Sequence, residues 1–149
     1  MSVIRIIAAL SLLAPLSAIA SYDPGRIKEG LMQDGVFQIQ GWESSQAGWR
    51  AQTDLRGVSL KLQADRLEML APYINNTQKN AALDRCETLG EIVLAAQTDQ
   101  DREAIARVVK SAAQHHLTKF TDMNGMRFEV TPVLKGPYVR LSCVARKYS

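Results

Sequence analysis

Few side chains in this sequence have the types and spacing that catalysis or metal binding requires. The two histidines, His115 and His116, are neighbours in the chain, and neighbouring side chains on a helix point about 100° apart. They are therefore poorly placed to share a metal ion, and the metal-binding spacing His-x-x-x-His is absent. His116 falls on the apolar side of a predicted helix, where a histidine ordinarily packs in the core. We predict no metal and no other cofactor.

Other catalytic arrangements have equally weak support. A nucleophilic triad would combine Ser142, one of the histidines and Asp122, but no motif such as Gly-x-Ser-x-Gly brings them together. Two carboxylate pairs at helical spacing suit the chemistry of glycoside cleavage, although such pairs ordinarily face solvent. These pairs are Asp65 with Glu68 and Asp99 with Glu103. The sequence therefore favours a non-enzymatic protein, and a small hydrolase is the alternative.

The residues best suited to recognition are the two tryptophans, Trp42 and Trp49. They flank a polar segment, residues 44–48, that contains serine and glycine. A tryptophan side chain offers a large rigid surface and one N–H donor, and it often anchors a protein partner or a sugar ring. We predict a contact surface made of both tryptophans and Arg50. The alternative is that both tryptophans pack against the core.

A second candidate surface is basic. Residues 21–101 carry 8 Lys and Arg against 12 Asp and Glu, whereas residues 102–149 carry 9 against 3. A basic region can bind an anionic partner, and the alternative is that the two oppositely charged parts attract each other in the fold. The residues predicted for this surface are Arg127, Arg140, Arg146 and Lys147. Nucleic acid is not an expected partner, because the sequence predicts export and the basic residues lack an interleaved aromatic platform beyond Tyr138 and Tyr148.

The first 20 residues have the pattern of a cleaved export signal. Arg5 and the terminal amine are positive, residues 6–14 are apolar, and the sequence Ala-Ile-Ala20 is a typical cleavage site. The apolar run is shorter than the roughly 20 residues that span a bilayer. We therefore predict a signal peptide at residues 1–20, a mature domain at residues 21–149 without a membrane-spanning segment, and a periplasmic or secreted location.

Export favours an oxidising compartment, in which the two cysteines of this chain form one disulfide. Cys86 and Cys143 are 57 positions apart, and a cross-link of that span stabilises a fold by about 4 kcal/mol in the chain-entropy model. The alternative, a redox-active pair of thiols, lacks the usual Cys-x-x-Cys motif.

The clearest structural pattern lies at the C-terminal end. Residues 126–134 and 138–145 alternate between apolar and polar side chains on either side of a turn at residues 135–137, which predicts a β-ribbon. The apolar members are Met126, Phe128, Val130 and Leu134, followed by Val139, Leu141, Cys143 and Ala145. The dipeptide Asn124-Gly125 predicts a tight turn that either begins the ribbon or links it to a short strand at residues 117–123.

Upstream patterns predict one strand and three helices. The strand covers residues 36–42 and could pair with the C-terminal ribbon, after a loose segment with a turn or two of helix at residues 26–32. The first helix covers residues 64–71, preceded by an ambiguous segment and ended by Pro72. The second covers residues 78–97, after a loop and cap at Asn75-Asn76-Thr77. The third runs from the cap Thr98 to about residue 116 or 120. Residues 91–96 also fit a short strand.

These patterns predict an α+β fold, with about three helices packed on a small antiparallel sheet that ends in a C-terminal β-hairpin or meander. The expected function is that of an exported, periplasmic binding protein such as an inhibitor, an immunity protein or an envelope accessory factor. Its partner would be another exported or envelope protein, or an anionic envelope polymer. The alternatives are a small hydrolase acting on envelope polymers and a structural subunit of an envelope complex.

Overall fold

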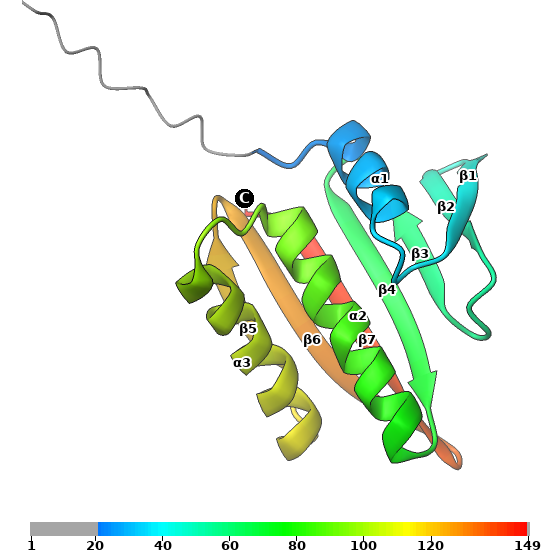
Figure 1. The fold of residues 1–149 in the computed structure, drawn as a ribbon, viewed down its shortest axis with the longest axis vertical. Helices are drawn as coiled ribbons and strands as arrows, with labels where there is room; N and C mark the ends of the chain where they lie inside the picture. The colour runs from blue at the N-terminus through cyan, green and yellow to red at the C-terminus, as the bar shows by residue number, and fades with distance from the viewer. Residues whose placement is uncertain (1–20, 149) are drawn as a thin grey trace, which may run out of the picture.

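Seven antiparallel strands form one sheet in residues 21–148, the part of the chain that the computed structural model describes (Figure 1). In chain order the elements are α1 (Pro24–Gln33), β1 (Ile39–Ser45), β2 (Gly48–Thr53), β3 (Ser59–Leu62), β4 (Arg66–Tyr73), α2 (Asn76–Leu94), α3 (Asp99–His115), β5 (Lys119–Met123), β6 (Met126–Lys135) and β7 (Tyr138–Lys147). The strand order is β1-β2-β3-β4-β7-β6-β5. This arrangement confirms the predicted α+β fold, in which three helices pack on an antiparallel sheet that ends in a meander.

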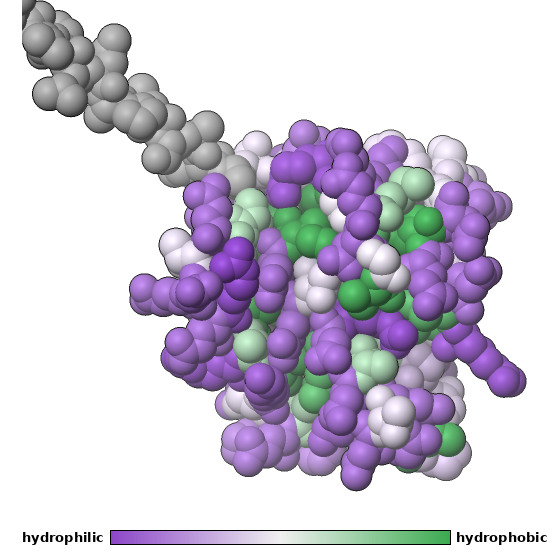
Figure 2. Space-filling model, viewed as in Figure 1, coloured by the Kyte–Doolittle hydropathy of each residue, from purple (hydrophilic) through white to green (hydrophobic). Residues whose placement is uncertain are grey.

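The three helices lie on one face of the sheet (Figure 1). The core lies between the two layers, because alternate residues of the central strands are fully buried beneath α2 and α3. Figure 2 shows that the helix-covered side is mostly hydrophilic on the outside, with small apolar areas between the helices. The opposite face carries no helix among residues 21–148, so the polar side chains of the strands meet solvent there directly.

The C-terminal ribbon is confirmed as β6 and β7. β7 pairs with the central strand β4, and β6 lies between β7 and the edge strand β5. The apolar face of the ribbon is buried as predicted, except that Val139 is half-buried and Leu134 is 74% exposed. The exposure of Leu134 arises because β6 continues past the end of its pairing with β5 at Val130. The turn at Asn124-Gly125 links β5 to β6, with both residues at positive φ.

The predicted helix at residues 64–71 is wrong, because this segment forms a turn and most of strand β4. Leu67, Leu70 and Ile74 recur at helical spacing, but they lie on an extended chain whose two faces both carry apolar residues. The residues buried on the helix side alternate strictly: Leu67, Met69, Ala71 and Tyr73. Pairing with β3 and β7 on either side stabilises the extended form, so tertiary context decides the outcome.

The strand predicted at residues 36–42 begins later, as β1, and the expected pairing with the C-terminal ribbon is wrong. β1 pairs with β2 in a hairpin whose turn follows Ser45. It is one edge strand of the sheet, and β5 is the other. The residues before it are also more ordered than predicted. α1 has 10 residues, it buries Ile27 and Leu31, and Arg26 donates hydrogen bonds to the carbonyl oxygens of Ile92 and Val93 at the end of α2.

The predicted N-cap Thr98 is confirmed. Within the predicted cap segment, residues 75–77, the cap is Asn75, so α2 begins two residues earlier than predicted. Asn75 accepts a hydrogen bond from the N–H of Gln78 at the start of α2. Thr98 and Asp101 form a capping box at the start of α3, which satisfies backbone donors that the first turn leaves free. Residues 91–94 are helical, so the alternative strand at 91–96 is wrong, and α2 ends at Ala95 in the left-handed conformation.

The disulfide between Cys86 and Cys143 is present and joins α2 to β7. Both cysteines are fully buried between the helical layer and the sheet. Of the helices in residues 21–148, none has the combination of length and apolar character that crossing a membrane demands. The predicted signal peptide, residues 1–20, lies outside the described residues.

Candidate functional site

The candidate site forms where β4 extends beyond its neighbour β3. The pairing of β3 with β4 ends at Ser59 and Leu70, whereas the pairing of β4 with β7 continues to Tyr73. The loop between β2 and β3 crosses this free end of β4. Gly57 in that loop has a φ of +75°, and a Cβ atom there would lie 2.8 Å from Cγ of Pro72. Only glycine allows so close an approach in this conformation.

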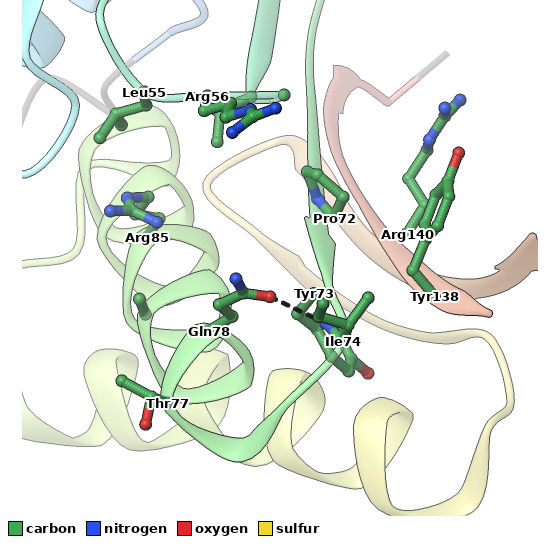
Figure 3. Close-up of a pocket in the computed structure, with 13 residues that line it drawn as sticks. Leu55, Arg56, Pro72, Tyr73, Ile74, Thr77, Gln78, Arg85, Tyr138 and Arg140 are labelled. Carbon is green, nitrogen blue, oxygen red and sulfur yellow. Dashed lines mark hydrogen bonds between the residues drawn. The ribbon is translucent and has the colours of Figure 1, made fainter.

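A groove of about 810 Å³ surrounds this end of β4, between the loop, the beginning of α2 and the beginning of β7 (Figure 3). We call it the β4 groove. It is lined by Leu55, Arg56, Gly57, Val58, Pro72, Tyr73, Ile74, Thr77, Gln78, Ala81, Arg85, Tyr138 and Arg140. Figure 3 shows Arg85 and Gln78 on one side of β4 and Tyr138 and Arg140 on the other, so the groove passes around the strand end.

The apolar part of the β4 groove has a well-defined backbone. The N–H of Ile74 donates to Oε1 of Gln78 at 3.0 Å, across the turn that begins α2 (Figure 3). This bond holds the backbone at the point where the side chain of Ile74 is 67% exposed. Pro72 is half-buried beside it and lacks an N–H, which suits the unpaired side of a strand.

The charged part of the β4 groove consists of three arginines without an acidic counterpart. None of the lining residues is an aspartate or glutamate. Within residues 21–148, Arg56, Arg85 and Arg140 form no ion pair, and the Nε of Arg85 makes one long hydrogen bond, 3.4 Å, to the carbonyl oxygen of Val36. Several other arginines do have carboxylate partners: Arg66, Arg102, Arg107, Arg127 and Arg146. The groove is therefore a positively charged site.

Tyr73 supplies an unused hydrogen-bonding group at the groove. Its side chain is 6% exposed, and its hydroxyl has no hydrogen-bond partner in the structure. Burial raises the pKa of Tyr73 above its usual value of 10, so the hydroxyl remains protonated at neutral pH and can donate. A buried polar group without a partner costs free energy, and this hydroxyl is itself inaccessible from solvent.

The two tryptophans predicted as contact residues lie on the helix-covered face, at the β1–β2 hairpin. The register pairs Ser44 with Trp49 and Trp42 with Ala51, so both rings share one face. Both rings are half-buried against the core, in agreement with the alternative that the sequence left open. Lys28 of α1 lies over the ring of Trp49, with its Nζ 4.2 Å from the centroid. Their role in binding stays a prediction.

The predicted basic residues do not form a single cluster, although Arg127, Arg146 and Lys147 line one hollow together with Tyr148. Strand register places Arg50, Arg127, Arg140 and Arg146 on the helix-free face of the sheet, whereas Lys147 lies on the other side of β7. Arg146 is 3.8 Å from a carboxylate oxygen of Glu129. Of these residues, Arg140 alone lines the β4 groove.

Arg127 has a local arrangement of its own. Its guanidinium makes two hydrogen bonds to the carboxylate of Asp122, at 2.8 and 2.9 Å, and lies between the rings of Phe120 and Tyr148. This hydrogen bonding holds the pKa of Asp122 below its usual range. Because the charge of Arg127 is already compensated, it is a weaker candidate for binding an anion than the arginines of the β4 groove.

The histidines lie at the end of α3. His116 is the exposed C-cap of the helix, with a φ of +53°, so its expected position on the apolar face is wrong. Its neighbour His115 is also exposed, and its Nδ1 lies 2.9 Å from the carbonyl oxygen of Ser111. The described residues contain no group of three or more potential metal ligands. Asp65 and Glu68 lie in the turn before β4 and in β4, so they are not on a helix as the sequence suggested.

Sequence reasoning missed most of the β4 groove. Arg56, Tyr73, Ile74 and Arg85 come from segments that were expected to be ambiguous, helical or a connecting loop. Pro72 was the available signal, because a proline that follows alternating apolar residues also indicates the unpaired end of a strand.

No protein-family model matches this chain, and neither a curated protein nor a solved structure shows significant similarity to it. Function is therefore inferred from the geometry of the site.

Proposed function

We propose that this protein is an exported, non-enzymatic binding protein that holds a segment of another exported or envelope protein in the β4 groove. The observation that carries the proposal is the set of three arginines, without ion-pair partners, around an exposed apolar floor. Binding sites commonly combine apolar surface with a few placed polar groups. The disulfide agrees with an oxidising compartment outside the cytoplasm.

The disulfide also supports a rigid groove. Cys86 follows Arg85 directly in α2, and Cys143 lies three positions after Arg140 in β7. One covalent bond therefore links the two elements that carry arginines on opposite sides of β4. A site whose walls are held in place before binding loses less conformational entropy when the partner arrives.

A photo-crosslinking experiment tests this function. A benzophenone amino acid replaces Ile74, which is 67% exposed in the groove, or Leu117, which is 58% exposed outside it. We expect the Ile74 probe to give an adduct with a specific exported protein. The adduct should be lost with Arg85→Glu and retained with Arg107→Glu, a helix arginine outside the groove that undergoes the same charge change.

Two results would count against the proposal. The first is the same set of adducts from both probe positions, which would indicate random encounters. The second is an Ile74 adduct that persists with Arg85→Glu, because the groove arginines would then have no part in holding the partner.

The surface predicted from the tryptophans is a second candidate contact site. Trp49 and Arg50 line a shallow hollow of about 220 Å³ near the turn of the β1–β2 hairpin. A Trp49→Ala variant that retains the fold but loses the Ile74 adduct would extend the contact surface from the β4 groove to this hairpin.

A further inference from the structure

We infer that the β4 groove recognises a peptide segment in which acidic residues flank an apolar side chain. This inference rests on the proposed function and specifies the chemistry of the bound segment. It follows from three features of the groove: where its charges lie, what lies between them, and which backbone groups are already in use.

The charges lie on both sides of the apolar floor. Arg85 projects from α2 on one side of β4, and Arg140 lies on the other side, opposite Pro72 in the pairing of β4 with β7 (Figure 3). Arg56 comes from the loop that crosses the strand end. A ligand that follows the groove around β4 therefore meets positive charge at two separate places, and a single carboxylate would engage only part of the site.

An apolar surface lies between these charges. Ile74 is 67% exposed, and Pro72 and Val58 line the same groove. Covering apolar surface is favourable in proportion to the area removed from water, at roughly 25 cal/mol per Å². A polyanionic glycan supplies charge but no aliphatic side chain for this floor, whereas a peptide supplies both.

The backbone at the end of β4 favours recognition through side chains, because it has few free hydrogen-bond donors for a bound peptide. A peptide that adds a strand to a sheet edge needs free donors and acceptors along that edge. At the end of β4, Pro72 has no N–H, and the N–H of Ile74 is already donated to Gln78. Strand addition is therefore disfavoured here, and side-chain contacts are left to determine specificity.

Selection from a library of random 12-residue peptides tests the inference, with the mature oxidised protein as bait. We expect the enriched peptides to carry Asp or Glu on both sides of Leu, Ile, Val or Phe. Binding of one enriched peptide is then measured by fluorescence anisotropy. Each of Arg85→Gln and Arg140→Gln should weaken it about threefold or more, as expected for partly exposed ion pairs, whereas Arg107→Gln should leave it unchanged.

Variants of the peptide separate its two components. Replacing its acidic residues by their amides should reduce binding about tenfold, and replacing its apolar residue by serine should reduce it by a similar factor. Equal binding of the serine peptide, together with full competition by dextran sulfate, would overturn the inference, because the groove would then respond to charge alone. Enrichment of basic or uncharged peptides would overturn it as well.

The outcome is distinguishable from a failure of the proposed function. A groove-dependent Ile74 adduct with a protein, combined with no enrichment of acidic peptides, would retain the binding function and reject the acidic segment. Loss of both results would reject the groove as a contact site altogether.

Discussion

Removal of the Cys86–Cys143 disulfide is expected to lower the free energy of unfolding by about 4 kcal/mol. The bond closes a loop with a sequence separation of 57 and joins α2 to a central strand. In the chain-entropy model, a cross-link of that span restricts the unfolded ensemble by about this amount. Domains of this size are stable by about 5–15 kcal/mol, so the loss is a large fraction of the total.

Urea unfolding followed by tryptophan fluorescence measures this loss. Trp42 and Trp49 pack against the core, so unfolding changes the environment of both. With a urea slope of about 2 kcal/mol per M, the midpoint should fall by about 2 M. Three samples are compared: the oxidised protein, the reduced protein, and the Cys86→Ala/Cys143→Ala variant.

The reduced protein distinguishes the effect of the covalent cross-link from the effect of packing by the two cysteine side chains. It retains both buried sulfur atoms, whereas the double variant also leaves a small cavity. The variant should therefore be at least as destabilised as the reduced protein, and reductant should not change it further. A midpoint shift of less than about 0.5 M on reduction, with the fold retained, would refute the entropic argument, because the loop would then be restricted without the bond.

Three further predictions concern α2 and α3. Thr98→Ala removes the hydroxyl that accepts a hydrogen bond in the capping box. It should lower the free energy of unfolding, measured in urea, by about 1 kcal/mol. An unchanged urea midpoint would show that the cap does not stabilise the fold. Backbone N–H groups hold the pKa of Asp101 below its usual range. The stabilising contribution of this carboxylate is therefore complete above the unfolded pKa of about 4 and is lost as the pH falls through the folded pKa. Between about pH 5 and pH 2 the free energy of unfolding should fall less for Asp101→Asn than for the unchanged protein, and an equal fall in both would contradict this role of Asp101. Gly90→Ala should destabilise the protein by about 1 kcal/mol, although alanine favours helices. The reason is that the added Cβ atom would lie 2.8 Å from Ile105 and 3.0 Å from Phe128. An increase in the thermal unfolding midpoint would show instead that these side chains move aside.

Local patterns predicted the C-terminal ribbon and the long helices well. The ribbon alternates with a period of two over two segments, and α3 begins with a capping box whose two members, Thr98 and Asp101, are three residues apart. Such signals act over one or two turns of chain, so they can be recognised without the rest of the fold. The disulfide was predicted from the expected export, the presence of two cysteines, and their positions on the apolar sides of a helix and of the ribbon.

Patterns failed where long-range pairing decides the structure. Residues 64–71 have apolar side chains at both helical and strand spacing. The choice is made by hydrogen bonding to β3 and β7, and β7 is about 70 residues away in the sequence. The length of α1 was underestimated for a similar reason: the sequence predicted only one or two turns at residues 26–32, whereas the helix has 10 residues. Its contacts with the rest of the fold include the hydrogen bonds of Arg26 to the end of α2, which the sequence does not reveal.

The β4 groove was missed because it exists only after three distant segments meet. Arg56, Arg85 and Arg140 have no shared motif, and each is unremarkable within its own segment. Their common property, the lack of a carboxylate partner, is a property of the folded protein. A search for charged runs instead selects Arg127 and Arg146, whose charges are compensated by Asp122 and Glu129.

The β4 groove also coincides with the place where the sheet departs from regular pairing. β3 stops short of its neighbour, Gly57 crosses the gap at positive φ, and Pro72 leaves the unpaired side of β4 without an N–H donor. Each feature by itself weakens a sheet, and the three occur together at the β4 groove. Proteins that are otherwise consistent at every level tend to depart from local rules at functional sites. This convergence, together with the uncompensated arginines, is why the β4 groove is a stronger candidate for binding than the larger helix-free face of the sheet.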